Sequence, residues 1–196
     1  MPKISDERRE ERRSQIIAAA LRRLSNTGYQ GTSMADIIAE SGLSAGAIYG
    51  YFSSKQELIL AVATSVVSGR QDEVLAASVD HVLEPAEIVT VLIDGLRENA
   101  PVHMLLQVWG EASVDPQLRT LLNEVLESAR ATITEQLARW ALTQPSLAED
   151  ASGWAGRAAP VLLALIPGFV TQLSLVDGFD EKRFLQTLPT VLRGSF

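Results

Sequence analysis

The sequence predicts an all-α protein of two parts, and three observations support this. Apolar residues recur three and four positions apart along most of the chain, and no stretch alternates strictly over the length of a strand. Prolines stand near the starts of the later periodic stretches, where a helix tolerates them. The periodic stretches are closely spaced up to about residue 69 and longer after about residue 81. We therefore expect about nine helices, divided between an N-terminal domain and a helical body.

The first predicted helix covers residues 6–26. Its apolar face consists of residues at helical spacing, among them Ile16, Ala20 and Leu24. Gly28 follows at the position where a helix commonly ends in the left-handed conformation, which glycine adopts without strain. We therefore expect this helix to end just before Gly28.

Two short helices come next. Ser33 and Asp36 have the spacing of a capping box, in which each side chain accepts a hydrogen bond from the backbone of the other residue. Gly42 ends the helix that this box opens. Ser44 is placed to cap a third helix, which we expect to reach Tyr51. The pattern is that of two short helices joined by a tight turn.

A long fourth helix is predicted over about residues 54–79, because Ser54 and Glu57 form a second capping-box pattern. The later helices are expected at residues 85–99, 102–113, 116–143, 147–176 and 181–193. We expect an N-terminal domain at residues 1–55 and a body at 75–196 to share the fourth helix instead of a flexible linker. Pro167 and Pro189 fall inside the last two helices, where they either bend the helix or line a cavity.

Composition limits the class of protein. The 196 residues are 46% hydrophobic and 21% charged, which is enough for a core and unlike a disordered chain. Because the chain has no cysteine, disulfides and thiolate metal sites are excluded. No run of eighteen apolar residues is present, and the charged start has no apolar signal segment. We therefore expect a cytoplasmic protein without a membrane partner.

The net charge of −7 conceals an uneven distribution. Residues 1–55 contain eight Lys or Arg against six Asp or Glu, whereas the remaining residues contain nine against eighteen. A mildly basic N-terminal part on an acidic body indicates two different tasks within one chain.

The second and third predicted helices have the layout of a helix-turn-helix. In that motif the second helix enters the major groove of DNA, and small residues such as Ala45 and Gly46 let its backbone approach the bases. Hydroxyls at the helix starts, the ammonium of Lys55 and the phenols of Tyr49 and Tyr51 can bind phosphates. A plain helical corner has the same layout, and Tyr49 can equally be a core residue. The layout alone therefore leaves DNA binding and a structural role open.

Four motifs follow one another over residues 12–62, namely I-I-x-A-A, G-Y-x-x-T-S, I-x-x-x-S-G-L-S-x-G-x-I-Y-x-Y-F and S-K-x-E-L. With this spacing the segment resembles the DNA-binding domain of the tetracycline-repressor (TetR) family of bacterial transcriptional regulators. The resemblance implies three groups of DNA-contacting positions. They are Thr32 and Ser33 at the start of the helix that braces the groove, Ser44, Ala45, Gly46 and Tyr49 on the recognition helix, and Tyr51 and Lys55 on the phosphate backbone.

Two positions depart from the family pattern. Ala45 and Gly50 stand where relatives often carry a longer polar or aromatic residue, and neither can donate a side-chain hydrogen bond to a base. Base readout is then expected to use an Ala45–thymine methyl contact, backbone amides, Thr32 and DNA shape. Arginines near the N-terminus either form an arm beside the minor groove or belong to a solvated helix end, because acidic residues interleave with them; they are Arg8, Arg9, Arg12 and Arg13.

The body resembles, less specifically, the effector-binding and dimerisation region of the same family, through stretches such as HMLLQVWGEASVDPQLRTLL. The predicted helix at 147–176 is apolar on nearly every side and therefore needs a partner beyond its own core. The resemblance implies that this partner is a second subunit, with helices 147–176 and 181–193 of each subunit forming a four-helix bundle. Such a homodimer would place its two N-terminal domains on the half-sites of a pseudo-palindromic operator, about one turn of the DNA helix apart.

Polar and aromatic residues on the otherwise apolar helices of the body are the candidates for contact with an effector. They are His103, Gln107, Trp109, Glu111, Trp140, Phe169 and Gln172. Each has a structural alternative, because single histidines are often hydrogen-bonded within a fold and tryptophans at helical spacing often belong to a core. Glu111 can also pair with Arg97 or Arg119.

The resemblance implies a one-component transcriptional regulator, a repressor that a small-molecule effector of unknown class releases from DNA. Two alternatives stay open, a dimeric regulator without an effector and an activator. An enzyme is not expected, because His81 and His103 are the only histidines and neither a nucleophile motif nor a phosphate-binding loop is present. No metal and no cofactor are expected either.

Overall fold

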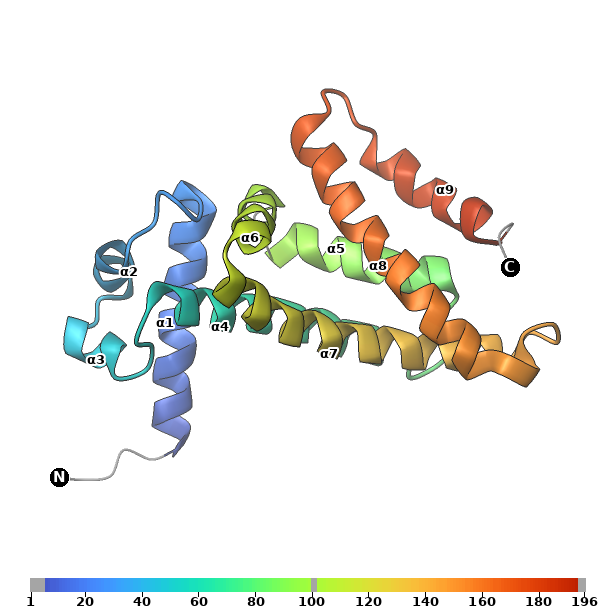
Figure 1. Ribbon diagram of the computed structural model, residues 1–196, viewed down its shortest axis with the longest axis horizontal. Helices are drawn as coiled ribbons and strands as arrows, with labels where there is room; N and C mark the ends of the chain where they lie inside the picture. The colour runs from blue at the N-terminus through green and yellow to red at the C-terminus, as the bar shows by residue number, and fades with distance from the viewer. Residues whose placement is uncertain (1–5, 100–101, 194–196) are drawn as a thin grey trace.

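The computed structural model describes residues 6–99 and 102–193, and all regular secondary structure within them is helical (Figure 1). Nine α-helices lie within the described residues. They are α1 (Asp6–Thr27), α2 (Met34–Ser41), α3 (Ala45–Tyr49), α4 (Lys55–Ala77), α5 (Pro85–Asn99), α6 (Val102–Val114), α7 (Pro116–Ala141), α8 (Ala151–Leu175) and α9 (Glu181–Arg193). The predicted all-α class, with an N-terminal helix-turn-helix domain and a helical C-terminal domain, is confirmed.

Four predicted helix boundaries are wrong by two residues or more, and one of them is the end of the fourth helix, at Ala77 instead of about residue 79. The third helix ends at Tyr49 instead of Tyr51, because the amide of Tyr51 donates to Ile48 O at 2.9 Å in a tighter turn. α7 ends at Ala141 instead of residue 143, ahead of Pro145, which disfavours the helical conformation at the residue before it. The helix expected to begin at 147 begins as a single 3-10 turn, η1 (Ala148–Asp150), before α8.

The short N-terminal helices are fixed by their caps. The amide of Asp36 donates to Ser33 Oγ at 3.2 Å and the amide of Ser33 donates to Asp36 Oδ2 at 2.8 Å, so the predicted capping box at α2 is confirmed. The Ser33 hydroxyl and amide lower the pKa of Asp36. At α4 the box is shifted, because Glu57 Oε2 accepts from the amide of Ser53 instead of Ser54.

Two hydrophobic cores lie at opposite ends of α4. The first joins α1 to α4 and also contains Met104 and Val108 of α6. The second joins the end of α4, from Val74, to α5, α7, α8 and α9. The helices α1, α2 and α3, which we call the head, therefore pack on α6 as well as on α4. α4 belongs to both cores. Figure 1 shows α1, α2 and α3 at one end of the molecule and α8 and α9 at the other.

α8 has a buried face and an exposed face. Ala155, Leu162 and Phe169 are buried against the second core, whereas Val161 is 61% and Leu175 is 71% exposed. By length and composition alone, residues 148–175 could cross a membrane, with a mean hydropathy of 1.8 over their most apolar window. This is weak evidence for a membrane span, because a helix of a packed protein passes the same test, and α8 packs against α5, α6 and α7.

Replacing Ser33 by alanine is expected to lower the free energy of unfolding by about 1 kcal/mol, because the first turn of α2 then loses its side-chain acceptor. Chemical denaturation measures the change. The matched control is Ser65→Ala, on an exposed position inside α4, for which we expect a change within about 0.5 kcal/mol. Equal effects of the two substitutions would contradict the cap as the source of stability.

Candidate functional site

α3 presents small residues and one aromatic ring at the surface of the head. Ser44, Ala45 and Gly46 are exposed, and a Cβ added to Gly46 would meet no atom within 4 Å. Tyr49 is 52% exposed, whereas Ile48 is fully buried in the first core and anchors the helix. The exposed face of α3 is therefore free for close approach by a large partner.

Ser33, Ser44 and Ser54 lie at the starts of α2, α3 and α4 and accept hydrogen bonds from backbone amides of their own helices. Thr32 lies beneath this surface instead of on it. It is 2% exposed, and its hydroxyl donates to Gly28 O at 2.7 Å and lies 2.8 Å from Thr27 Oγ1. The structure thus gives the Thr32 side chain an internal role in the turn after α1.

Lys55, at the first position of α4, reaches back to that turn. Its Nζ donates to Tyr29 O at 2.6 Å and lies 4.1 Å from the centre of the Tyr29 ring. Burial lowers the pKa of Lys55, and Glu111 opposes this effect. An ammonium has three donors, so Lys55 can bind a phosphate while it holds Tyr29. Tyr51 is half-buried and packs against the first core.

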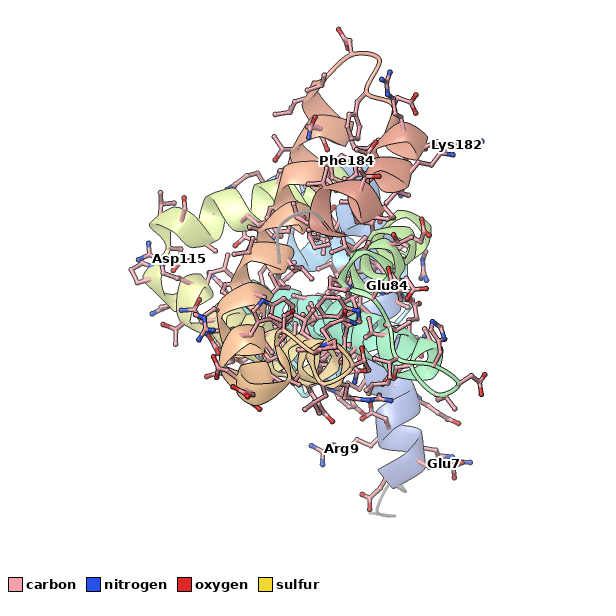
Figure 2. All side chains as sticks on the ribbon, turned by 90° about the vertical axis from the view of Figure 1, so that its right-hand side faces the viewer. Glu7, Arg9, Glu84, Asp115, Lys182 and Phe184 are labelled. Carbon is pink, nitrogen blue, oxygen red and sulfur yellow. The ribbon has the colours of Figure 1, made fainter. Side chains whose placement is uncertain are left out.

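The basic residues of the N-terminal segment lie on the outward end of α1. In Figure 2 the labelled Glu7 and Arg9 lie where α1 projects beyond the other helices. Arg12 is also exposed. Arg13 packs inward, with its guanidinium 5.7 Å from the centre of the Phe52 ring and 3.6 Å from Glu10.

The turn after α1 is bonded to α6 of the body. The amide of Tyr29 donates to Gln107 Oε1 at 2.7 Å, and Gln30 Nε2 donates to Glu111 Oε2 at 2.6 Å. Gly28 has a φ of +71°, and a Cβ on it would overlap the Gln107 side chain. The residues 28–30, Gln107 and Glu111 form what we call the junction. The sequence suggested these α6 residues as effector contacts and offered other partners for Glu111, so their bonds to the head were missed.

A cavity of about 510 Å³ lies between α4, α5, α6, α7 and α8. Its lining is mostly aliphatic, with Ile59, Val62 and Val66 from α4 and Leu163 from α8 among the apolar residues. The exposed lining residues come from α7 and α8, so the cavity opens to solvent along these two helices. Pro167 also lines it, whereas Pro189 lines two other pockets near α5.

Of the predicted effector contacts whose side chains are described, only Trp109 lines this cavity. Trp140 packs on Trp154 with ring centres 5.4 Å apart. Phe169 is buried 5.3 Å from the Phe184 ring.

Three other predicted contacts, Gln107, Glu111 and Gln172, lie outside the cavity lining. Gln107 and Glu111 belong to the junction, and Gln172 is exposed on α8. The side chains of His103 and Arg97 lie outside the described residues. Within the described part of the chain, no three His, Cys, Asp or Glu side chains gather in a way that could hold a metal ion.

Arg70 is a charged residue within the apolar lining that was not predicted from the sequence. It is 8% exposed, and its Nη2 lies 2.7 Å from Glu73 Oε1. Its Nε and Nη1 are buried without a hydrogen-bond acceptor. Each such buried donor costs about 1–3 kcal/mol. The spacing of Val62, Val66, Arg70 and Val74, each four residues after the last, places Arg70 on the apolar face of α4 and could have revealed it.

Four other polar side chains of the lining, those of Gln71, Thr132, Glu127 and Arg130, have partners. Gln71 Nε2 donates to Ser128 Oγ and Thr132 Oγ1, both at 3.0 Å. Arg130 Nη1 lies 3.3 Å from Glu127 Oε1 at the exposed edge. A Cβ on Gly95 of α5 would overlap both Arg70 and Glu73, so this glycine leaves the room that the ion pair occupies.

Comparison with known proteins identifies the family. Residues 16–62 match the family model of bacterial regulatory proteins of the tetR family. The chain is 30% identical to the HTH-type transcriptional regulator BetI of Burkholderia lata, over 93% of this chain and 91% of the relative. The chain belongs to the TetR family. It is therefore a helix-turn-helix transcriptional regulator, and the predicted family is confirmed.

Solved TetR-type structures share the fold. A transcriptional regulator from Saccharomonospora viridis in complex with choline has a TM-score of 0.69 and 24% identity, over 95% of this chain and 97% of that one. FadR from Bacillus subtilis in complex with stearoyl-CoA has a TM-score of 0.69 and 19% identity, over 92% and 95%. At these identities the likeness shows the fold alone.

Tyr49→Ala is expected to weaken binding to a specific DNA site by at least about tenfold, since it removes the exposed ring of α3, the predicted recognition helix. Tyr49→Phe keeps the ring and separates the contribution of the hydroxyl. The thermal midpoint should hardly change, because the ring is half exposed. Fluorescence anisotropy with labelled duplex gives both affinities, and wild-type binding by Tyr49→Ala would mean that the ring serves packing only.

Proposed function

We propose that this TetR-family chain is a cytoplasmic repressor that binds a pseudo-palindromic operator as a homodimer and is released when a small molecule occupies the cavity between α4 and α8. The observation that carries the proposal is the position of α6. One face of α6 lines the cavity through Met104, Leu105 and Val108, and another face bonds the head through Gln107. A ligand that moves α6 therefore acts directly on the turn that precedes the helix-turn-helix.

α4 provides a second connection between cavity and head. Ile59, Val62 and Val66 line the cavity, and Lys55 at the start of the same helix bonds to Tyr29 of the junction. A ligand shifts the protein between two arrangements only by its difference in affinity for them. α4 and α6 both line the cavity and both contact the head. An arrangement of these helices that fits the ligand better therefore need not keep the distance between the two heads of the dimer that fits the operator.

The exposed apolar face of the last two helices supports a homodimer. Val161, Leu175 and Val176 on α8 or at its end, and Val191 on α9, are all exposed although they are large and apolar. A second copy packed on this face would bury them across a two-fold axis. It would also carry two heads to half-sites about one turn of DNA apart.

The effector class is not decided by the comparisons. The relative from Burkholderia lata carries the name BetI, and one structural neighbour binds choline, a cation. Another neighbour binds stearoyl-CoA, which combines a long apolar chain with negative charge. At 24% and 19% identity neither neighbour's ligand carries over to this chain, so the effector is proposed only as a small molecule.

A binding selection from random duplexes, followed by a salt titration on the selected site, tests the proposal. We expect a two-fold symmetric site and a steep fall of affinity with salt. Lys55→Ala should reduce the slope of log affinity against log salt by about 0.9 for each phosphate that the variant no longer binds, whereas the control Lys182→Ala on exposed α9 should not. Selection of an asymmetric site would contradict the dimer, and an unchanged slope would restrict Lys55 to its bond with Tyr29.

Gln107→Ala should weaken the coupling between ligand binding in the cavity and operator binding by the head. The affinity of the DNA-free protein for the ligand should hardly change. Gln107 does not line the cavity, yet it accepts the hydrogen bond of Tyr29 N. We expect the coupling between ligand and operator to fall by about 1 kcal/mol. Ligand titrations with and without operator measure it, and Gln117→Ala, an exposed glutamine on α7, is the matched control. Equal coupling in Gln107→Ala and wild type would remove the junction from the mechanism.

A further inference from the structure

The large cavity combines an apolar wall with one buried cationic side chain. We infer that its ligand is a carboxylate with an apolar tail, whose carboxylate binds Arg70 and whose tail lies along α4, α6 and α7. This inference rests on the proposed function, in which the same cavity holds the effector. It adds the chemical class of that effector.

The apolar part of the lining favours a hydrocarbon tail. Leu92 and Leu96 of α5, Leu105 of α6 and Leu122 and Ile133 of α7 all face the cavity of about 510 Å³. The hydrophobic effect is non-directional, so burial of apolar surface raises the affinity for many different hydrocarbon tails to a similar extent. The polar groups of the site must therefore decide which headgroup is accepted.

Arg70 is the buried cationic group of the lining, and it has bonding capacity to spare. Gln71 and Thr132 are bonded to each other, and Arg130 pairs with Glu127 at the exposed edge. Arg70 is 8% exposed and uses Nη2 for Glu73, while Nε and Nη1 have no acceptor. Both nitrogens are covered by neighbouring atoms, so the guanidinium has to turn toward the headgroup as the ligand enters. A carboxylate that accepts from either nitrogen satisfies a buried donor with a charge-assisted hydrogen bond.

A cationic headgroup has no comparable partner within the lining. A quaternary ammonium is recognised by several aromatic rings or by an unpaired carboxylate, whereas the lining offers the single ring of Trp109 and the carboxylate of Glu127, which is paired with Arg130. Arg70 presents only hydrogen-bond donors, which a cation cannot use, and its partner Glu73 is already engaged in the ion pair. Arg70 therefore both binds an anionic headgroup and disfavours a cationic one.

Three ligands with one tail and different headgroups test the inference: decanoate, decanol and decyltrimethylammonium, each kept below the concentration at which it forms micelles. Titration calorimetry on the full-length protein should give decanoate at least about a tenfold advantage over each of the others. Arg70→Met should abolish that advantage, and Arg70→Lys should retain part of it. Arg130→Met, which alters the other cation of the lining, should leave it unchanged.

Stronger binding of decyltrimethylammonium, absence of binding by decanoate, or an advantage that survives Arg70→Met would overturn the inference. Loss of the advantage in Arg130→Met instead would place the headgroup at the exposed edge and would also overturn it. Thermal unfolding of each variant shows whether it is folded. If Arg70→Met does not fold, the decanoate advantage is measured in Arg70→Lys instead, where we expect it to be reduced but not lost.

Release of the selected operator by the same ligands separates this inference from the proposed function. If decanoate binds through Arg70 but does not release the operator, the ligand class holds and effector release fails. If decyltrimethylammonium binds better and releases the operator, effector release holds and the ligand class fails.

Discussion

The left-handed backbone at Gly28 is the constraint on which the arrangement of head and body depends. With a φ of +71° and no Cβ, this residue lets the chain turn out of α1 directly against the Gln107 side chain. The next two residues are then close enough to bond to α6, Tyr29 through its amide and Gln30 through its side chain. A residue with a Cβ at position 28 would be strained by the positive φ, and its Cβ would displace the end of the Gln107 side chain that accepts from the Tyr29 amide.

α4 connects the head and the cavity as one rigid element. Lys55 at its start is bonded to Tyr29, and Arg70 faces the cavity four helical turns later, about 22 Å along the axis at 1.5 Å per residue. Val74 then enters the second core. A shift of α4 caused at Arg70 would thus reach the start of the same helix at Lys55, beside the turn that follows α3, without an intervening flexible segment.

α8 has three different environments around it, and each of them accepts apolar side chains. This explains why its sequence is apolar on nearly every side. One side packs in the second core, a second side lines the cavity through Leu163 and Pro167, and a third side is exposed with Val161 and Leu175. An apolar residue in this helix can therefore indicate burial, a ligand wall or a partner surface. Composition alone does not distinguish the three.

Local signals in the sequence determined the helices, the caps at Ser33 and Ser44, the left-handed Gly28 and the family, because each depends on residues close together in the chain. The tertiary structure decided which side chains meet. Gln107 accepts a hydrogen bond from a residue 78 positions away, Trp109 is the one predicted contact with a described side chain that lines the cavity, and Arg70 has unsatisfied donors. Helical periodicity gives the face of a residue, but the partner across that face depends on how α4, α5 and α6 pack, which no short stretch of sequence encodes.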